Sequence, residues 1–201
     1  MSEHYFSEKP SSKTERGLIR CTLRGINLEF ITDSGIFSHT KIDNGTRLLI
    51  ESMIIPETGS FLDLGCGYGP IGITAAKLNS KLSVIMTDIN RRAVDLTVEN
   101  AKRNHVRNVE VFQTAFYKGV KHRLFDTVVS NPPISAGMKD VVKPMVTEAV
   151  SNLKLGGVIQ LVVQTNKGGN TLSSYLESSF GNIEILARGG GYRVLSARRK
   201  P

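Results

Sequence analysis

Short, nearly continuous apolar runs recur along the chain, and most of them end in a polar or acidic residue. They span residues 61–64, 82–88, 109–113, 125–130 and 158–163. Between them, apolar residues fall at helical spacing over residues 71–78, 91–103, 140–153 and 171–180. Apolar strands that alternate with amphipathic helices are typical of a parallel sheet with right-handed crossovers. The pattern therefore predicts an α/β fold with a doubly wound, mostly parallel sheet.

The end of the chain departs from this alternation. The predicted strands 183–187 and 192–197 are separated only by Arg188-Gly189-Gly190-Gly191, which is too short for a helical crossover. Strands joined in this way must be antiparallel. We therefore expect a Rossmann-like, seven-stranded sheet with an antiparallel last strand, which the 201 residues can build as one domain.

The segment before this alternation has its own pattern. Residues 18–23 and 26–32 have the composition of strands and flank Arg24-Gly25, which predicts a β-hairpin. A helix capped by Asn44 or Asp43 is expected next, and it would carry Leu48, Leu49, Glu51, Ser52 and Met53. We accordingly divide the chain into a flexible arm (1–16) and a single domain (17–201). Within that domain, 17–34 form the hairpin, 35–58 a helical lead-in and 59–201 the core.

Charge and composition narrow the class of protein. The 26 Lys and Arg residues exceed the 18 Asp and Glu residues, for a net charge of +8 and a pI near 9.6. This excess favours a polyanionic partner such as RNA, although a basic soluble protein would show it too. The two cysteines and four histidines have no metal-ligand spacing. Because there is also no bilayer-length apolar run and no secretory signal, we expect a cytoplasmic protein without a metal or a membrane partner.

Residues 61–72 form the most informative stretch, Phe-Leu-Asp-Leu-Gly-Cys-Gly-Tyr-Gly-Pro-Ile-Gly. An apolar strand here turns sharply into a helix. Glycines at such a turn allow positive φ and let a ligand approach the backbone closely. The first amides of the following helix point toward that ligand. The stretch therefore predicts a binding site for a nucleotide cofactor.

Two cofactors fit the glycine spacing. Gly67, Gly69 and Gly72 satisfy G-x-G-x-x-G, and Asp88 lies 21 residues after Gly67, which matches a dinucleotide fingerprint. An NAD-binding domain is therefore open on these residues alone. Asp63, however, directly precedes the turn, where a carboxylate would lie beside a pyrophosphate. It would suit a cofactor that carries a cationic amino group better.

A second motif, Asn131-Pro132-Pro133-Ile134, follows the apolar run 125–130. Together with the glycine turn, it resembles the class I S-adenosylmethionine-dependent methyltransferases. Gly35-Ile36-Phe37-Ser38 and Asp43-x-Gly45-Thr46-x-Leu48-Leu49 resemble one family among them, the small-subunit ribosomal RNA guanine-N2 methyltransferases. The resemblance covers about residues 35–198. It implies S-adenosyl-L-methionine as the cofactor, ribosomal RNA as the partner, and a lead-in segment that closes over the cofactor or simply packs as a capped helix.

The resemblance also implies a set of binding residues at the carboxyl ends of neighbouring strands, where α/β sheets bind ligands. Asp63 and the backbone of Gly65 and Gly67 would hold the methionine part, Asp88 the ribose hydroxyls, and Ala115 with its neighbour the adenine. The full cofactor set is Asp63, Gly65, Cys66, Gly67, Tyr68, Gly69, Asp88, Ile89, Thr114, Ala115 and Asn131. Within it, Cys66 is expected to be a small side chain that fits the turn rather than a nucleophile.

Asn131, Pro132, Pro133 and Ile134 are the predicted catalytic residues. An exocyclic amine is a weak nucleophile because its lone pair is delocalised into the ring. The Asn131 side-chain oxygen and the Pro132 carbonyl could accept its two hydrogens and leave the lone pair facing a methyl donor. The prolines fix φ and keep both acceptors in place. Such positioning needs no strong base.

The residue after Pro-Pro bears on the substrate. Methyltransferases of adenine N6 and of protein glutamine usually carry Tyr or Phe there, and the guanine-N2 family commonly carries Phe, whereas this chain has Ile134. Ile134 offers apolar contact without a ring, so we expect Phe37 to supply the ring. Lys139 and Arg193 would contact the RNA. A protein glutamine N-methyltransferase and a non-catalytic RNA-binding module of the same fold remain open.

Overall fold

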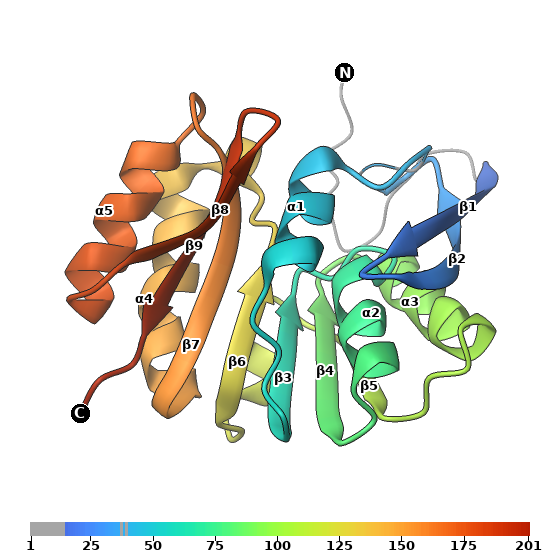
Figure 1. Cartoon of the computed structure of the whole chain (residues 1–201), viewed down its shortest axis with the longest axis horizontal. Helices are drawn as coiled ribbons and strands as arrows, with labels where there is room; N and C mark the ends of the chain where they lie inside the picture. The colour runs from blue at the N-terminus through green and yellow to red at the C-terminus, as the bar shows by residue number, and fades with distance from the viewer. Residues whose placement is uncertain (1–14, 37, 39) are drawn as a thin grey trace.

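The computed structural model describes residues 15–36, 38 and 40–201. Its core is a seven-stranded sheet of order β5-β4-β3-β6-β7-β9-β8 (Figure 1). The strands are β3 (Gly59–Leu64), β4 (Leu82–Asp88), β5 (Val109–Gln113), β6 (Phe125–Ser130), β7 (Leu153–Gln164), β8 (Glu184–Gly189) and β9 (Tyr192–Arg198). β9 lies antiparallel between β7 and β8, and the other neighbouring strands are parallel. The predicted sheet with its antiparallel last strand is therefore confirmed.

Helices cover both faces of the sheet. They are α1 (Asn44–Ser52), α2 (Pro70–Leu78), α3 (Arg91–Arg103), α4 (Lys143–Asn152) and α5 (Gly169–Phe180). Successive residues of β3 face opposite sides, because side chains alternate along a strand. Phe61 packs with apolar residues of α1–α3, whereas Leu62 packs with those of α4 and α5. No helix among the described residues is long and apolar enough to cross a bilayer.

The predicted hairpin is present as β1 (Arg16–Leu23) and β2 (Ile26–Asp33). Arg24 and Gly25 form its turn at φ 47° and 79°, as a tight hairpin turn requires. Side chains of α3 pair with the backbone of β2: Asn100 accepts from the Ile31 amide at 2.7 Å and donates to the Ile31 carbonyl at 2.8 Å. Asn104 does the same with Glu29 at 3.0 and 2.7 Å. These hydrogen bonds satisfy backbone N–H and C=O groups on the free edge of β2 and join the hairpin to the domain.

Two predicted boundaries were wrong. The arm was expected to reach residue 16, but β1 already begins at Arg16, and residues 1–14 lie outside the described part of the chain. The helix expected over 140–153 begins with a π-helical turn at Met138–Val142 and ends at Asn152. β7 then runs through Gly156 and Gly157 instead of starting after them. Gly156 has a φ of 80°, and a Cβ on Gly157 would lie 2.9 Å from the Lys154 carbonyl oxygen, so this pair forms a local irregularity within the strand.

Candidate active site

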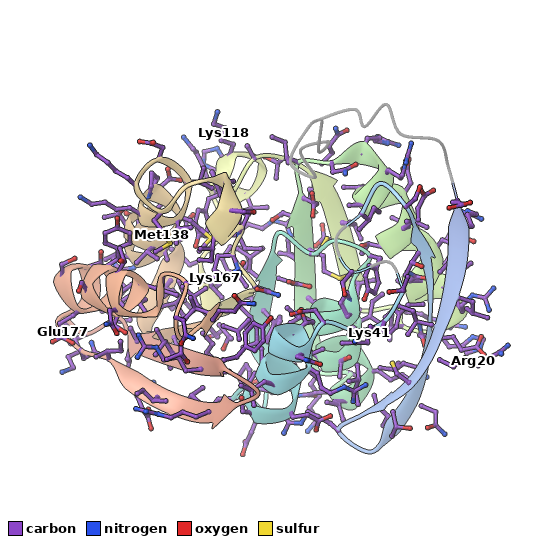
Figure 2. The ribbon with its side chains drawn as sticks, turned by 90° about the horizontal axis from the view of Figure 1, so that it is seen from above. Arg20, Lys41, Lys118, Met138, Lys167 and Glu177 are labelled. Carbon is purple, nitrogen blue, oxygen red and sulfur yellow. The ribbon has the colours of Figure 1, made fainter. Side chains whose placement is uncertain are left out.

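A cavity of about 670 Å³ opens at the edge of the sheet where β3, β4, β5 and β6 end. Figure 2 views the molecule onto this edge and labels Lys167, one of the lining residues. Twelve of the residues predicted from the sequence line this one cavity: Gly65, Cys66, Gly67, Tyr68, Asp88, Ile89, Thr114, Ala115, Asn131, Pro132, Pro133 and Ile134. The structure thus brings the glycine turn and the Asn-Pro-Pro motif together.

The three glycines of the turn have different surroundings. Gly65, Gly67 and Gly69 all have positive φ, at 75°, 58° and 94°. A Cβ on Gly65 or Gly67 would meet nothing within 4 Å, so their backbone faces open space in the cavity. A Cβ on Gly69 would lie 2.7 Å from Ile73 Cδ1 and 3.1 Å from Thr97 Cγ2. Gly69 is therefore required for packing beneath the turn, and it does not line the cavity.

Asp63 also lies beneath the turn rather than in the cavity. It shares a face of β3 with Phe61, its side chain is fully buried, and its Oδ2 accepts a hydrogen bond from the Gly72 amide at 2.8 Å. Its Oδ1 has no partner among the described residues. Burial, with a smaller contribution from the nearby Asp88, raises the pKa of the Asp63 carboxyl to about 7, although the hydrogen bond from Gly72 acts in the opposite direction. In this structure Asp63 joins β3 to α2 and does not line the cavity, and its contact with a cofactor amino group stays a prediction.

Asp88 lines the cavity from the end of β4. Its Oδ2 accepts from the Gly67 amide and its Oδ1 from the Asn90 amide, both at 2.9 Å. Burial raises the pKa of the Asp88 carboxyl to about 6, although these backbone hydrogen bonds act in the opposite direction. Asp88 thus holds the glycine turn beside β4. An ionised carboxylate has about four lone-pair sites, so it can still accept from a ligand.

Hydrogen bonds hold the start of the Asn-Pro-Pro motif in place. Ser130 donates through Oγ to the Leu64 carbonyl at 2.6 Å, which joins the ends of β6 and β3. The Asn131 amide nitrogen donates to Thr46 Oγ1 at 2.9 Å and to Asp43 Oδ2 at 3.2 Å. Within the described part of the chain, Asn131 Oδ1 accepts no hydrogen bond. This oxygen is therefore available to a ligand in the cavity.

A γ-turn holds the Pro132 carbonyl in place. Pro133 has φ −75° and ψ 74°, and the Ile134 amide donates to the Pro132 carbonyl at 2.8 Å. These angles are those of an inverse γ-turn. The carbonyl keeps a second lone pair. Ile134 continues into a short 3₁₀ turn and lies close to Gly168, whose Cβ would be 3.4 Å from Ile134 Cγ2.

Two of the three residues predicted to contact the substrate lie away from the cavity. Arg193 donates to Asn170 Oδ1 at 3.0 Å, and a Cβ on Gly169 would lie 2.7 Å from its Nη2, so it packs against the start of α5. Lys139 is exposed on the π-helical turn. Neither of them lines the cavity, because the registers of β9 and of this turn direct them elsewhere. Phe37 lies outside the described residues.

Other lining residues were not among the predicted site residues. They include Ile36, Ser38, Asp43 and Thr46 from the lead-in, and Phe116, Gln164, Lys167 and Tyr192 from loops and strand ends. Phe116 has a φ of 47°, which is uncommon for a residue with a side chain. The sequence contained a signal for the lead-in residues, since they belong to the two stretches, 35–38 and 43–49, that resemble the guanine-N2 family. No group of His, Cys, Asp and Glu that could hold a metal occurs within residues 15–36, 38 and 40–201.

The sheet topology, the glycine turn and the cavity at its carboxyl edge define the class I methyltransferases, which use S-adenosylmethionine. The chain belongs to the methyltransferase small domain family, whose model matches residues 27–196. It is 38% identical to the uncharacterized protein YbxB of Bacillus subtilis, over 99% of this chain and 100% of that protein. It is 31% identical to the ribosomal RNA small subunit methyltransferase C of Haemophilus influenzae, over 82% of this chain but only 49% of that protein. This chain therefore spans about half the length of that relative.

A solved structure gives a similar result. The Thermus thermophilus 16S rRNA N2 G1207 methyltransferase, in complex with AdoMet and guanosine, superposes with a TM-score of 0.81 at 26% identity. The match covers 92% of this chain and 51% of that one. The ribosomal protein L11 methylase of Lactobacillus delbrueckii matches at a TM-score of 0.60 and 23% identity, which shows the fold alone.

The cavity fits the cofactor that the family and the fold imply. Gly65 and Gly67 leave the backbone open to a ligand, and Asp88 offers carboxylate oxygens one strand away. Ile89, Ala115 and Phe116 provide apolar surface for a planar ring beside it. A glycine-lined turn, an acceptor for hydroxyl groups and an apolar surface are the three features that an adenosyl cofactor needs. S-Adenosyl-L-methionine is therefore the cofactor of this fold and family.

Proposed function

We propose that this methyltransferase acts on RNA and methylates the exocyclic amine of a base, with guanine N2 of ribosomal RNA as the acceptor. The observation that carries the proposal is the placement of Asn131 and Pro132 in the same cavity as the glycine turn. A methyl donor on the turn would then face two fixed oxygen acceptors. The relatives that act on small-subunit ribosomal RNA and the net charge of +8 support RNA as the substrate.

In this proposal the cofactor supplies a methyl group bound to a cationic sulfur. The open backbone at Gly65 and Gly67 accommodates its methionine part. Asp88 accepts hydrogen bonds from the ribose hydroxyls with its remaining lone pairs. The adenine lies against the apolar side chains of Ile89 and Phe116. These roles account for the open space beside the turn without a direct contact from Asp63 or Gly69.

Asn131 and Pro132 position the acceptor. The Asn131 oxygen and the second lone pair of the Pro132 carbonyl accept the two hydrogens of the amine. Both acceptors are fixed before the substrate arrives, Asn131 by Asp43 and Thr46 and Pro132 by the γ-turn. Preorganised acceptors of this kind lower the barrier without a strong base. The proton that the amine loses after methylation passes to solvent.

The base needs a surface against which to lie. Ile134 supplies apolar contact on one side of the motif. Tyr192 adds an aromatic ring to the cavity lining, and its hydroxyl is held by Gln164 at 2.9 Å. Tyr192 thus offers in the described structure the ring that the motif itself lacks.

Methyl transfer from tritiated S-adenosyl-L-methionine tests the proposal. The acceptors are ribosomal RNA and total protein from cells that lack this gene, and the methylated nucleoside is identified by mass spectrometry. We expect N2-methylguanosine with the wild type and at least a 100-fold slower transfer with Asn131→Ala, because the Asn131 oxygen is one of the two fixed acceptors that position the amine. The cofactor Kd should stay within about threefold.

Asn44→Ala is the matched control, since Asn44 is exposed on α1 and does not line the cavity. It should methylate RNA at the wild-type rate. Transfer to protein and not to RNA would replace the proposal with a protein N-methyltransferase. Absence of cofactor binding in calorimetry would leave a non-catalytic module. Equal loss of cofactor binding and methyl transfer in Asn131→Ala would make Asn131 a structural residue.

A further inference from the structure

We propose that Asp43 is a positioning residue that decides which end of the Asn131 amide faces the acceptor amine, and that Thr46 supports this orientation as a second acceptor for the Asn131 NH₂ group. The inference rests on the proposed function, because it assigns Asn131 its role toward an amine. A side-chain amide has an oxygen and an NH₂ group of nearly the same shape. Only the oxygen can accept a hydrogen from the amine. The reverse orientation would place two donors against each other and prevent binding.

The contacts of Asn131 select one orientation. Its Nδ2 carries two hydrogens, and two acceptors lie within reach, Asp43 Oδ2 at 3.2 Å and Thr46 Oγ1 at 2.9 Å. An ionised carboxylate accepts hydrogen bonds and cannot donate them. If the Asn131 amide were turned over, its oxygen would face that carboxylate with no hydrogen between them. Asp43 therefore keeps the Asn131 oxygen on the side of the cavity.

Asp43 is itself fixed from two directions. Its Oδ2 also accepts from the Thr46 amide at 2.9 Å, which caps the N-terminus of α1. Its Oδ1 lies 3.5 Å from the Tyr192 hydroxyl, which accepts from Gln164 at 2.9 Å and can donate its own hydrogen to Asp43. Gln164 thus donates to Tyr192, and Tyr192 donates to one oxygen of the Asp43 carboxylate. The Asn131 amide donates to the other oxygen of that carboxylate.

The packing around the network explains a glycine in the same motif. A Cβ on Gly45 would lie 2.7 Å from the Tyr192 ring. The ring can lie against the first turn of α1 only because this position is glycine. The motif Asp43-x-Gly45-Thr46 thus supplies a cap, a space for Tyr192 and two acceptors for Asn131. Residues 43–46 therefore position the Asn131 side chain as well as packing against the domain.

Substitutions can separate the capping role of Asp43 from its role toward Asn131. Ser is as good an N-cap as Asp, but its shorter side chain does not reach Asn131 and its hydroxyl can donate. Asp43→Ser should therefore keep α1 and lose the orientation. Asp43→Asn should keep both, since one amide oxygen at the place of Oδ2 can accept from Thr46 and from Asn131. It serves as the conservative rescue. Thr46→Val removes one acceptor at constant shape, and Thr46→Ser restores it.

We expect Asp43→Ser to lower kcat for methyl transfer about 10- to 100-fold, the range of a lost charge-assisted hydrogen bond. Asp43→Asn should stay within about fivefold of the wild type, and the cofactor Kd within about threefold in both. Combining Asp43→Ser with Asn131→Ala should be no worse than Asn131→Ala alone, because both changes remove the same acceptor. Additive losses would refute the inference. So would a rise in cofactor Kd as large as the fall in kcat, which would make Asp43 a cofactor ligand.

A measurement without any methyl acceptor separates this inference from the proposed function. The Asn131 side-chain NH₂ signals are assigned in a ¹⁵N spectrum by their disappearance in Asn131→Ala. They should exchange with solvent slowly in the wild type and in Asp43→Asn, and at least 10-fold faster in Asp43→Ser. If no RNA is methylated but this contrast is seen, the proposed function fails while the positioning stands. If RNA is methylated and Asp43→Ser changes neither exchange nor kcat, the positioning fails alone.

Discussion

Gly67 and Gly69 lie two residues apart in the same turn, yet an alanine at each should affect a different property of the protein. A Cβ on Gly67 would enter open space in the cavity, whereas a Cβ on Gly69 would lie 2.7 Å from Ile73 Cδ1. Gly67→Ala should therefore block the cofactor and leave the fold nearly intact. Gly69→Ala should destabilise the fold and affect the cofactor only through it.

The structure sets the size of each effect. Gly67 has a φ of 58°, which a residue with a side chain adopts at a cost of about 1–2 kcal/mol. In a domain of this size that lowers Tm by about 2–8 °C. Gly69 is also in the left-handed region, with a φ of 94°, and a Cβ there would overpack a buried site and cost about 1–3 kcal/mol more. We expect Gly69→Ala to lose about 2–5 kcal/mol of unfolding free energy.

Urea denaturation and calorimetric titration with S-adenosyl-L-methionine measure the two effects separately. Gly67→Ala should raise the cofactor Kd at least 30-fold, the result of excluding a ligand from contact with the backbone. Combining Gly69→Ala with Ile73→Val should recover part of the lost stability, since valine lacks the Cδ1 atom that the new Cβ would meet. Normal cofactor binding by Gly67→Ala would refute the placement of the ligand on this turn. Equal stability of the two alanine variants would refute the distinction between the glycines.

Three further predictions concern groups outside the cavity lining. Burial raises the pKa of Asp63 from 3.8 to about 7. The contribution of the protonated Asp63 side chain to the free energy of unfolding is therefore fully present below pH 4 and is lost as the pH rises through 7. Urea denaturation between pH 4.5 and 8 should show the wild type losing stability relative to Asp63→Asn, and parallel pH profiles would contradict this. Asn100→Ala removes both side-chain hydrogen bonds to the Ile31 backbone. It should lower the free energy of unfolding by about 2–4 kcal/mol and speed hydrogen exchange of the Ile31 amide. Unchanged exchange would mean that other contacts hold the hairpin on the domain. Arg193→Met should leave the KM for RNA within about twofold and lower Tm by a few degrees, because Arg193 holds Asn170 at the start of α5; a sharp rise in KM would return Arg193 to the substrate site.

The sequence supported most of the fold because strands and helices depend on residues close together in the chain. The apolar runs predicted β4, β5 and β6 closely, and the short connection at Arg188-Gly189-Gly190-Gly191 required the antiparallel pairing of β8 and β9. The extent of β7 could not be predicted in the same way. Gly156 and Gly157 end a helix as readily as they interrupt a strand. Pairing with β6 and β9 decided between the two.

The site was predictable where the backbone alone determines it. Glycines after a strand mark a turn, and parallel strand ends meet at one edge, so Gly67, Asp88 and Asn131 were expected together and line one cavity. The direction of individual side chains was less predictable. Asp63 turns toward α2 and Arg193 toward α5 because of where those helices pack. No local pattern contains that information.

By itself, the sequence determined which segments form strands and helices, where the chain can turn sharply, and which polar residues follow the strands. These properties follow from hydrophobic periodicity and from the conformational freedom of glycine and proline, which act over a few residues. Only the tertiary structure decided that Asn131 meets Asp43, which lies 88 residues earlier in the chain. The reason is physical: hydrogen-bond partners are set by which segments the fold brings within hydrogen-bond distance of one another, and that arrangement depends on the packing of the whole domain.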